Sequence, residues 1–256
     1  MKIIPLLFIL LLGGCNGKEP AIAVTSLEVN SNKLSKPAVN IGNISLPPGY
    51  KRLVCETGSF GEWLRAIPLK NDKAVYLYNG QLKKDQSVQF AVLDITVGTK
   101  DLQQCADAVM RLRADYLFAQ KRYSQIVFRD NNGKAYKWEG GDDRAGFNRY
   151  LETVFGWCGS ASLEKQLLPV PDAATIQPGD VFIKGGFPGH AMIVADVAVN
   201  PNGERIFLLA QSYMPAQDIH VVNNPGDQEL GPWYTLEEMI YTPEWTFVKR
   251  QLRRWE

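Results

Sequence analysis

Residues 179–213 read GDVFIKGGFPGHAMIVADVAVNPNGERIFLLAQSY and carry the clearest structural signals in the chain. A Gly-Asp turn leads into a short apolar strand, and a Gly-Gly-Phe-Pro-Gly loop then leads to His190. Residues 190–199 and 205–213 are predicted strands, joined at Asn202-Gly203, a pair that favours a hairpin turn. The stretch therefore predicts antiparallel strands, with His190 at the start of one of them and beside a glycine-rich loop. Catalytic groups favour such positions.

The predicted two-residue turn also determines which residues face each other. It pairs Val194 with Gln211, which leaves Gln211 on the face of His190 but on the order of 13 Å away along the strand. A histidine base needs a polar group on its second ring nitrogen. Gln211 is the preferred group, provided that twist or a bulge brings the two side chains together. Ser212 is predicted to point to the other face.

A strand and a helix are predicted upstream of this hairpin. Residues 88–97 are β-branched and apolar, which indicates a buried strand ending at Gly98. Apolar residues then recur at spacings of three and four, as on one face of a helix, at Leu102, Cys105, Val109, Leu112 and Tyr116. Asp101 is the predicted N-cap, and Gln104 completes a capping-box pattern.

Cys105 is expected in or just beyond the first turn of that helix. Free backbone N–H groups and the positive end of the helix dipole favour an anion there. The pKa of the thiol can therefore fall below about 8.5, which makes the nucleophilic thiolate available near neutral pH. A cysteine on an apolar helix face is also often only a small core residue. The helix alone leaves both interpretations open.

The remaining histidine and cysteines are weaker candidates. His220, in the alternating segment AQDIHVV, is interpreted as an ordinary strand histidine. Cys158 lies in FGWCGS, which is similar over four residues to the sequence around the papain nucleophile, so it competes with Cys105. Cys158 is also a fair disulfide partner for Cys55, which would leave Cys105 free. Cys105 is therefore the preferred nucleophile.

The order of these parts resembles the NlpC-type branch of the papain-like cysteine hydrolases over roughly residues 88–222. Those enzymes cut peptide bonds in bacterial cell-wall peptidoglycan, and some relatives are amidases or acyltransferases. The resemblance implies an α+β fold, with a papain-like (NlpC-type) helix packed on an antiparallel sheet and additional N-terminal and inserted elements. It also implies Cys105 as nucleophile, His190 as base and Gln211 as the third polar residue.

A second resemblance spans nearly all of the expected folded part. The segments GSFGEWLRAIPLK, DLQQCADAVMRLRADYL, GDVFIKGGFPGH, LLAQSYMPAQDIH and YTPEWTF resemble a family of exported bacterial proteins known only as a domain of unknown function. This likeness implies no activity.

The N-terminus, MKIIPLLFILLLGGCNGKEP, predicts an exported lipoprotein. Its apolar run is shorter than the about 20 residues that span a bilayer, and it fits an export signal. Leu-Gly-Gly-Cys resembles a bacterial lipobox, which implies a signal peptide at residues 1–14 and lipidation of Cys15. An ordinary signal peptide cut elsewhere is the alternative. Residues 15–45 predict a flexible tether, and residues 46–256 a single globular α+β domain.

Composition argues against several classes of partner. The chain has 28 basic and 27 acidic residues, and no basic stretch indicates nucleic acid. DNNGKAYKWEGGDDR lacks the ligand spacing of a calcium loop, the cysteines and histidines form no zinc pattern, and we expect no cofactor. Asp107, Arg111 and Asp115 are spaced for ion pairs on a solvated helix face rather than for a substrate site.

These observations predict a lipid-anchored cell-envelope cysteine hydrolase that acts on an amide bond. The expected partners are peptidoglycan stem peptides, or another envelope peptide or glycan, and the membrane through the lipid. A location facing the periplasm is expected, because NGKEP after Cys15 lacks an acidic run. The alternative is a non-catalytic envelope lipoprotein that binds glycan or peptide through its aromatic residues.

Overall fold

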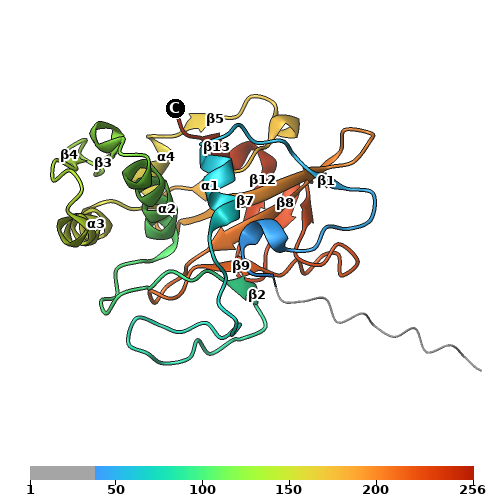
Figure 1. The fold of residues 1–256 in the computed structure, drawn as a ribbon, viewed down its shortest axis with the longest axis horizontal. Coiled ribbons are helices and arrows are strands. Elements are labelled where there is room, and N and C mark those ends of the chain that lie inside the picture. Colours follow the sequence, from blue (N-terminus) through green and yellow to red (C-terminus); the bar gives the residue numbers. More distant parts are fainter. Residues whose placement is uncertain (1–37) are drawn as a thin grey trace, which may run out of the picture. The chain divides into compact units, whose positions relative to one another are not determined.

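The structure is a computed structural model and describes residues 38–256. A nine-stranded antiparallel sheet forms the centre of these residues (Figure 1). Its main path runs β2-β9-β8-β7-β6-β13-β5, and β1 and β10 pair with β7 and β8 beside this path. These strands are β1 (Lys51–Arg52), β2 (Gln89–Val92), β5 (Leu168–Pro169), β6 (Val181–Lys184), β7 (His190–Val199), β8 (Arg205–Gln211), β9 (His220–Val222), β10 (Tyr234–Thr235) and β13 (Leu252–Arg254). Two hairpins form separate small sheets, β3 (Val127–Arg129) with β4 (Ala135–Lys137) and β11 (Met239–Tyr241) with β12 (Thr246–Val248). The predicted α+β class with an antiparallel sheet is confirmed.

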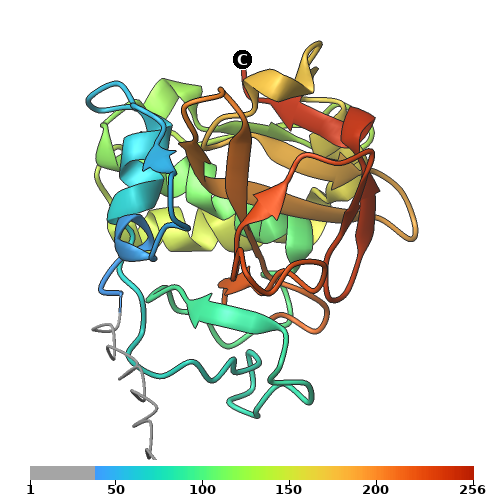
Figure 2. The same cartoon turned by 90° about the vertical axis from the view of Figure 1, so that its right-hand side faces the viewer.

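The α-helices cover one side of this sheet (Figure 2). The α-helices are α1 (Phe60–Ala66), α2 (Cys105–Ala119), α3 (Arg144–Trp157) and α4 (Ser160–Glu164), and short 3-10 helices occupy Ile41–Asn43, Tyr123–Gln125, Ala173–Thr175 and Lys249–Gln251. Ser59 caps α1 by accepting a hydrogen bond from the Glu62 backbone, and Asp143 caps α3 in the same way through Gly146. α2 lies between α3 and the sheet (Figure 1).

The two faces of the central strands belong to different apolar clusters. Ala191 and Ile193 of β7 face the helices, whereas Met192 and Val194 face the β11–β12 hairpin. Alternation of side chains across a strand produces this division, and it explains why β7 is buried along almost its whole length.

The β7–β8 hairpin has a different register from the predicted one. Its loop has three residues, because Asn200 and Glu204 close it by a backbone hydrogen bond around Gly203 in a left-handed conformation. A β-bulge between Val194 and Asp196 then shifts the pairing again, so Val194 faces Leu209 and not Gln211. Both changes move Gln211 towards His190.

The packed body begins before the expected boundary at residue 46. Ile41 and Ile44 are fully buried in the core on the helix side of the sheet, so residues 38–45 are not part of a free tether. The predicted signal peptide, the lipidation site Cys15 and the rest of the predicted tether lie outside the described residues. Within residues 38–256, no helix has the length and apolar character needed to cross a bilayer.

Candidate active site

Cys105 is the first residue of α2. Gln104, and not Asp101, is the N-cap: its backbone N–H donates to Asp107 Oδ2 at 3.0 Å in a capping box. Asp101 is engaged elsewhere, because its Oδ1 accepts the Ala216 backbone N–H at 2.7 Å. Cys105 therefore lies one turn closer to the helix end than the predicted cap would place it.

The segment before Cys105 is tied to the end of β8. Ser212 Oγ lies 2.8 Å from the carbonyl oxygens of both Gln103 and Gln217, to one of which it donates. Ser212 points to the helix side of the sheet, as predicted, and so holds the start of α2 against the strand that carries Gln211. Ser212 therefore fixes the position of β8, which carries Gln211, relative to the start of α2, which carries Cys105.

His190 and Gln211 form a direct contact. His190 Nε2 lies 2.8 Å from Gln211 Oε1, and both side chains are buried. Continuing the observed register places Gln211 opposite Met192, so it is the diagonal neighbour of His190 on the same face. The expected partnership of these two residues is thus present, and the bulge in β7 is what makes it possible.

Two further groups determine the orientation of the Gln211 amide. Gln211 Nε2 donates to Glu244 Oε2 at 2.7 Å, and the other oxygen of Glu244 pairs with Lys83 Nζ at 2.7 Å. A carboxylate can only accept, so the amide nitrogen must face Glu244 and the amide oxygen must face His190. His190 therefore carries its proton on Nε2, and its Nδ1 is left as the basic nitrogen.

His220 contacts the same amide from the neighbouring strand. Its Nδ1 lies 2.9 Å from the Asp218 carbonyl, to which it donates, and its Nε2 accepts from Gln211 Nε2 at 3.4 Å. Burial lowers the pKa of His220 to about 3, so it is neutral at physiological pH. His220 is more than an ordinary strand histidine, because it forms part of the support for Gln211.

Aromatic rings surround the imidazole of His190. The ring centroids of Tyr213, Trp245 and Phe247 lie 5.0, 5.3 and 5.9 Å from that of His190. These rings exclude water, and burial lowers the pKa of His190 to about 4, although the hydrogen bond to Gln211 acts in the opposite direction. His190 is therefore an unprotonated base at neutral pH.

The Cys105 thiol lies beside the start of β7. The backbone N–H of Ala191, the residue after His190, is among the groups that favour the thiolate of Cys105. Burial raises the pKa of Tyr213, and Glu244 and Cys105 are the neighbours that raise it further. Of the two interpretations left open for Cys105, lowering of the thiol pKa is not the one found, however. Burial raises the pKa of Cys105, and the nearby Asp107 carboxyl raises it further. Thiol and imidazole are both neutral in the resting site.

Cys158 lies in a different environment. It is buried at the end of α3, and burial raises its pKa to about 12. The neighbours that act on its pKa are Asp130, Asp107 and Ser162, and no histidine is among them. Cys55 and Cys158 are both free, so the disulfide proposed between them is not formed. Cys105 is the cysteine that the fold brings to the strand of His190.

Sequence reasoning did not find Glu244 and Lys83. Glu244 lies in the segment YTPEWTF and Lys83 in a loop more than a hundred residues away, and neither has a pattern that marks it as part of a site. Among residues 38–256, no group of three or more histidine, cysteine, aspartate or glutamate side chains is placed to hold a metal ion.

Comparison with known proteins gives one match. A family model described as a domain of unknown function (4846) matches residues 42–141 and 135–254. Searches of curated proteins and of solved structures give no match.

Proposed function

We propose that this chain, which belongs to that family of unknown function, is a cysteine hydrolase that cleaves amide bonds. The observation that carries the proposal is the 2.8 Å contact between His190 Nε2 and Gln211 Oε1, with Cys105 at a helix start beside the same strand. Cys105 is the nucleophile, His190 the general base and Gln211 the residue that orients the base.

The neutral resting pair favours a mechanism in which proton transfer accompanies attack. His190 Nδ1 accepts the thiol proton while Cys105 Sγ forms a bond to the substrate carbonyl carbon. Free backbone N–H groups in the first turn of α2 stabilise the oxyanion. The imidazolium then protonates the leaving amine, and Gln211 Oε1 stabilises the charged ring through Nε2–H. Water, deprotonated by His190, hydrolyses the thioester and restores the thiol.

The finer assignment follows the resemblance to the NlpC-type hydrolases. Two features are compatible with a papain-like fold. A helix starts at the nucleophile, and an antiparallel sheet carries the base and the orienting residue. With export and lipidation at Cys15, the substrate is an amide in a peptidoglycan stem peptide, and the enzyme is anchored in the envelope facing the periplasm.

Digestion of purified peptidoglycan, with fragments identified by mass spectrometry, tests the proposal. Wild type is expected to release peptide fragments and Cys105→Ala none, while Cys158→Ala, the matched control, keeps the activity. His190→Asn is expected to reduce the rate by about 100-fold or more, because general-base catalysis contributes at least that much. Equal release by Cys105→Ala and wild type would exclude Cys105 as the nucleophile.

The burial of the site favours a second function, a non-catalytic module that binds glycan or peptide. His190 is 2% exposed and the thiol pKa of Cys105 is raised, as in an inert buried site. In that case wild type and Cys105→Ala bind peptidoglycan equally, and neither releases fragments.

A further inference from the structure

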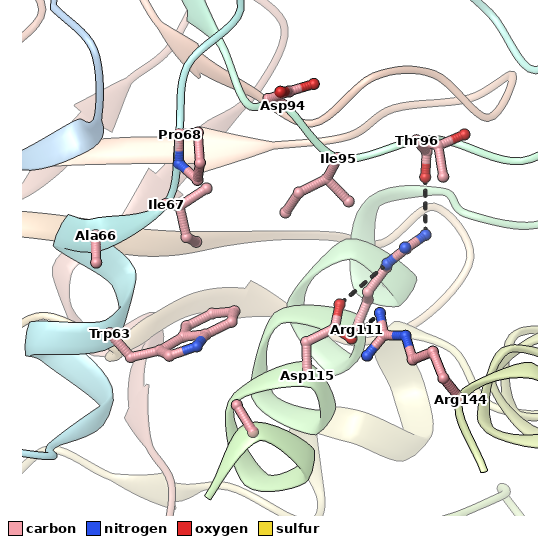
Figure 3. A pocket seen from close by; sticks show the side chains of 11 residues that line it. Trp63, Ala66, Ile67, Pro68, Asp94, Ile95, Thr96, Arg111, Asp115 and Arg144 are labelled. Carbon is pink, nitrogen blue, oxygen red and sulfur yellow. Dashed lines mark hydrogen bonds and ion pairs between the residues drawn. The ribbon is translucent and has the colours of Figure 1, made fainter. Parts of the chain in front are cut away.

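A cavity of about 440 Å³ lies between α1, α2 and the segment 94–96 (Figure 3). Its volume falls within the range of small-molecule sites, about 300–1,000 Å³. Arg111, which lines it, lies roughly 9 Å along the helix from Cys105, given the rise of an α-helix. The cavity is thus distinct from the candidate active site.

One side of the cavity is apolar. Trp63 comes from α1, Ile67 and Pro68 follow that helix, and Ile95 faces them from the segment after β2 (Figure 3). Ala66 of α1 and Ala119 of α2 add small methyl groups to the cavity wall. This side can accept a hydrocarbon or aromatic group.

The other side holds one carboxylate between two guanidinium groups. Asp115 Oδ2 accepts from Arg111 Nε at 3.3 Å, and Asp115 Oδ1 lies 2.8 Å from Arg144 Nη2 (Figure 3). Arg111 is held in place, because its Nη1 donates to the Thr96 carbonyl at 2.9 Å and to Gln103 Oε1 at 2.7 Å. The predicted i,i+4 ion pair between Arg111 and Asp115 is present, but Asp107 and Asp115 are buried rather than on a solvated face. The charges of Arg111, Asp115 and Arg144 leave this side of the cavity with a net charge of +1.

Several polar atoms at this side have no hydrogen-bond partner within the described residues. Asp115 Oδ1 is buried and forms an ion pair with Arg144 Nη2 at 2.8 Å, but it accepts no hydrogen bond of normal geometry. Arg111 Nη2 and the remaining nitrogens of Arg144 make no hydrogen bond to residues 38–256. The buried Asp115 Oδ1 can still accept a hydrogen bond, and the guanidinium nitrogens beside it can still donate, so this side of the cavity has both kinds of group to offer a ligand.

We propose that this cavity binds an apolar amino acid that has an acylated nitrogen and a free carboxylate. The carboxylate pairs with Arg111 Nη2 and with the guanidinium group of Arg144, because charged N–H donors bind carboxylates strongly. The amide N–H donates to Asp115 Oδ1, and the side chain packs against Trp63 and Ile95. Asp94 on the opposite rim disfavours a second negative charge. A peptide C-terminus and a free N-acyl amino acid share this chemistry.

Calorimetric titration of the whole chain with N-acetyl-phenylalanine tests the proposal. The acid is expected to bind, and N-acetyl-phenylalanine amide, which lacks the charge, to bind about tenfold or more weakly. Arg144→Gln should weaken binding of the acid by a similar factor. Arg149→Gln is the matched control, because Arg149 lies on the same helix, is 72% exposed and does not line the cavity.

Two further variants keep the result interpretable. Ala66→Leu together with Ala119→Leu fills the cavity from exposed helix positions and should abolish binding without unfolding the protein. Cys105→Ala should leave binding unchanged, since the inference does not depend on the proposed hydrolase. Tighter binding of Gly-Gly-Phe than of N-acetyl-phenylalanine assigns the site to a peptide C-terminus, and the reverse assigns it to the free acid. Equal affinity for acid and amide, or no binding at millimolar concentration, overturns the proposal.

Discussion

At the scale of single residues, Glu244 determines which nitrogen of His190 carries the proton. Glu244 Oε2 accepts from the Gln211 amide nitrogen, which forces the amide oxygen towards His190. Without that acceptor the amide can turn over and present its nitrogen to the ring. Nε2 of His190 would then become an acceptor and the proton would move to Nδ1, so the basic nitrogen of the proposed mechanism would be lost.

Glu244→Ala is therefore expected to change the tautomer of His190. Nitrogen NMR of the imidazole should show the Nε2–H form in wild type and a substantial Nδ1–H population in the variant. Loss of the partner of Lys83 and Gln211 should also lower the free energy of unfolding by about 1–3 kcal/mol. Glu238→Gln is the control, since the Glu238 side chain is 73% exposed and its ion pair is with Lys249. An unchanged tautomer in Glu244→Ala would contradict the role given to Glu244.

The two buried histidines predict a loss of stability in mild acid. Burial lowers the pKa of His190 to about 4 and that of His220 to about 3, whereas the unfolded chain titrates near 6.5. The unfolded state thus binds more protons as pH falls from about 6.5 to 4, and unfolding becomes easier. For His190 alone the loss reaches about 3 kcal/mol at pH 4.

Denaturant titrations from pH 7 to 4.5 on wild type and His190→Asn measure this effect. Buried carboxyls with raised pKa values, Asp107 and Asp180, act in the opposite direction, but both proteins contain them. The stability of wild type should therefore decline more steeply with falling pH than that of the variant. Parallel curves would show that His190 is not held neutral by the fold.

The candidate residues could be predicted from the sequence, whereas their support could not. His190 and Cys105 stand beside recognisable boundaries, a glycine-rich loop and a helix start, and Gln211 follows from strand alternation. The direction of the Cys105 pKa shift could not be predicted, because the helix end is visible in the sequence but the depth of burial is not. Glu244 supports Gln211 from 33 residues away, a separation that no local pattern encodes.

At the scale of secondary-structure elements, Asp180 in the Gly-Asp turn joins two strands. Its carboxylate is fully buried and receives Arg254 Nε at 2.6 Å and Arg254 Nη2 at 2.8 Å. Asp180 begins the approach to β6 and Arg254 ends β13, so this bidentate pair fastens the C-terminal strand to the centre of the sheet.

Asp180→Asn should lower the free energy of unfolding by about 2 kcal/mol or more. The change removes the carboxylate charge that pairs with the Arg254 guanidinium. Because Arg254 is partly exposed, water offsets part of this loss. Chemical denaturation at pH 7 measures it, with Asp142→Asn, at an exposed position, as the control. A shift in midpoint equal to that of Asp142→Asn would contradict this role.

The strands were easier to predict than their pairing. Residues 190–199 form β7 within the predicted bounds, because a run of β-branched and small apolar residues between turns is a strong local signal. The register depends on the bulge near Asp196, whose carboxylate pairs with Arg52 and Arg65 from the N-terminal part of the chain. A long-range ion cluster of this kind is invisible to a local pattern, and so the predicted distance between His190 and Gln211 was wrong.

At the scale of the whole described unit, the N-terminal segment closes the core on the helix side of the sheet. Trp233 Nε1 donates to the Ser45 carbonyl at 2.8 Å, and Arg52 donates to the Ile44 carbonyl. Low hydrophobicity made residues 15–45 resemble a tether, but two isoleucines near its end fill space that the sheet and α1 leave open. Average hydrophobicity over residues 15–45 does not reveal two buried side chains near residue 45, yet these two are enough to pack that end of the segment into the core.

Ile41→Ala in the whole chain is therefore expected to lower the free energy of unfolding by about 2–5 kcal/mol, the cost of a cavity in a packed core. Val39→Ala, two residues away and 68% exposed, removes a similar side chain and should change stability by less than about 0.5 kcal/mol. Denaturant unfolding followed by tryptophan fluorescence compares the two, since Trp233 lies in the same core. Equal stability of the two variants would show that residues 38–45 are part of the tether, and the folded body would then begin near residue 46. A large difference places the start of the folded body at residue 41 or earlier, and a protein shortened to residue 46 would lack part of the core that holds α1 against β7.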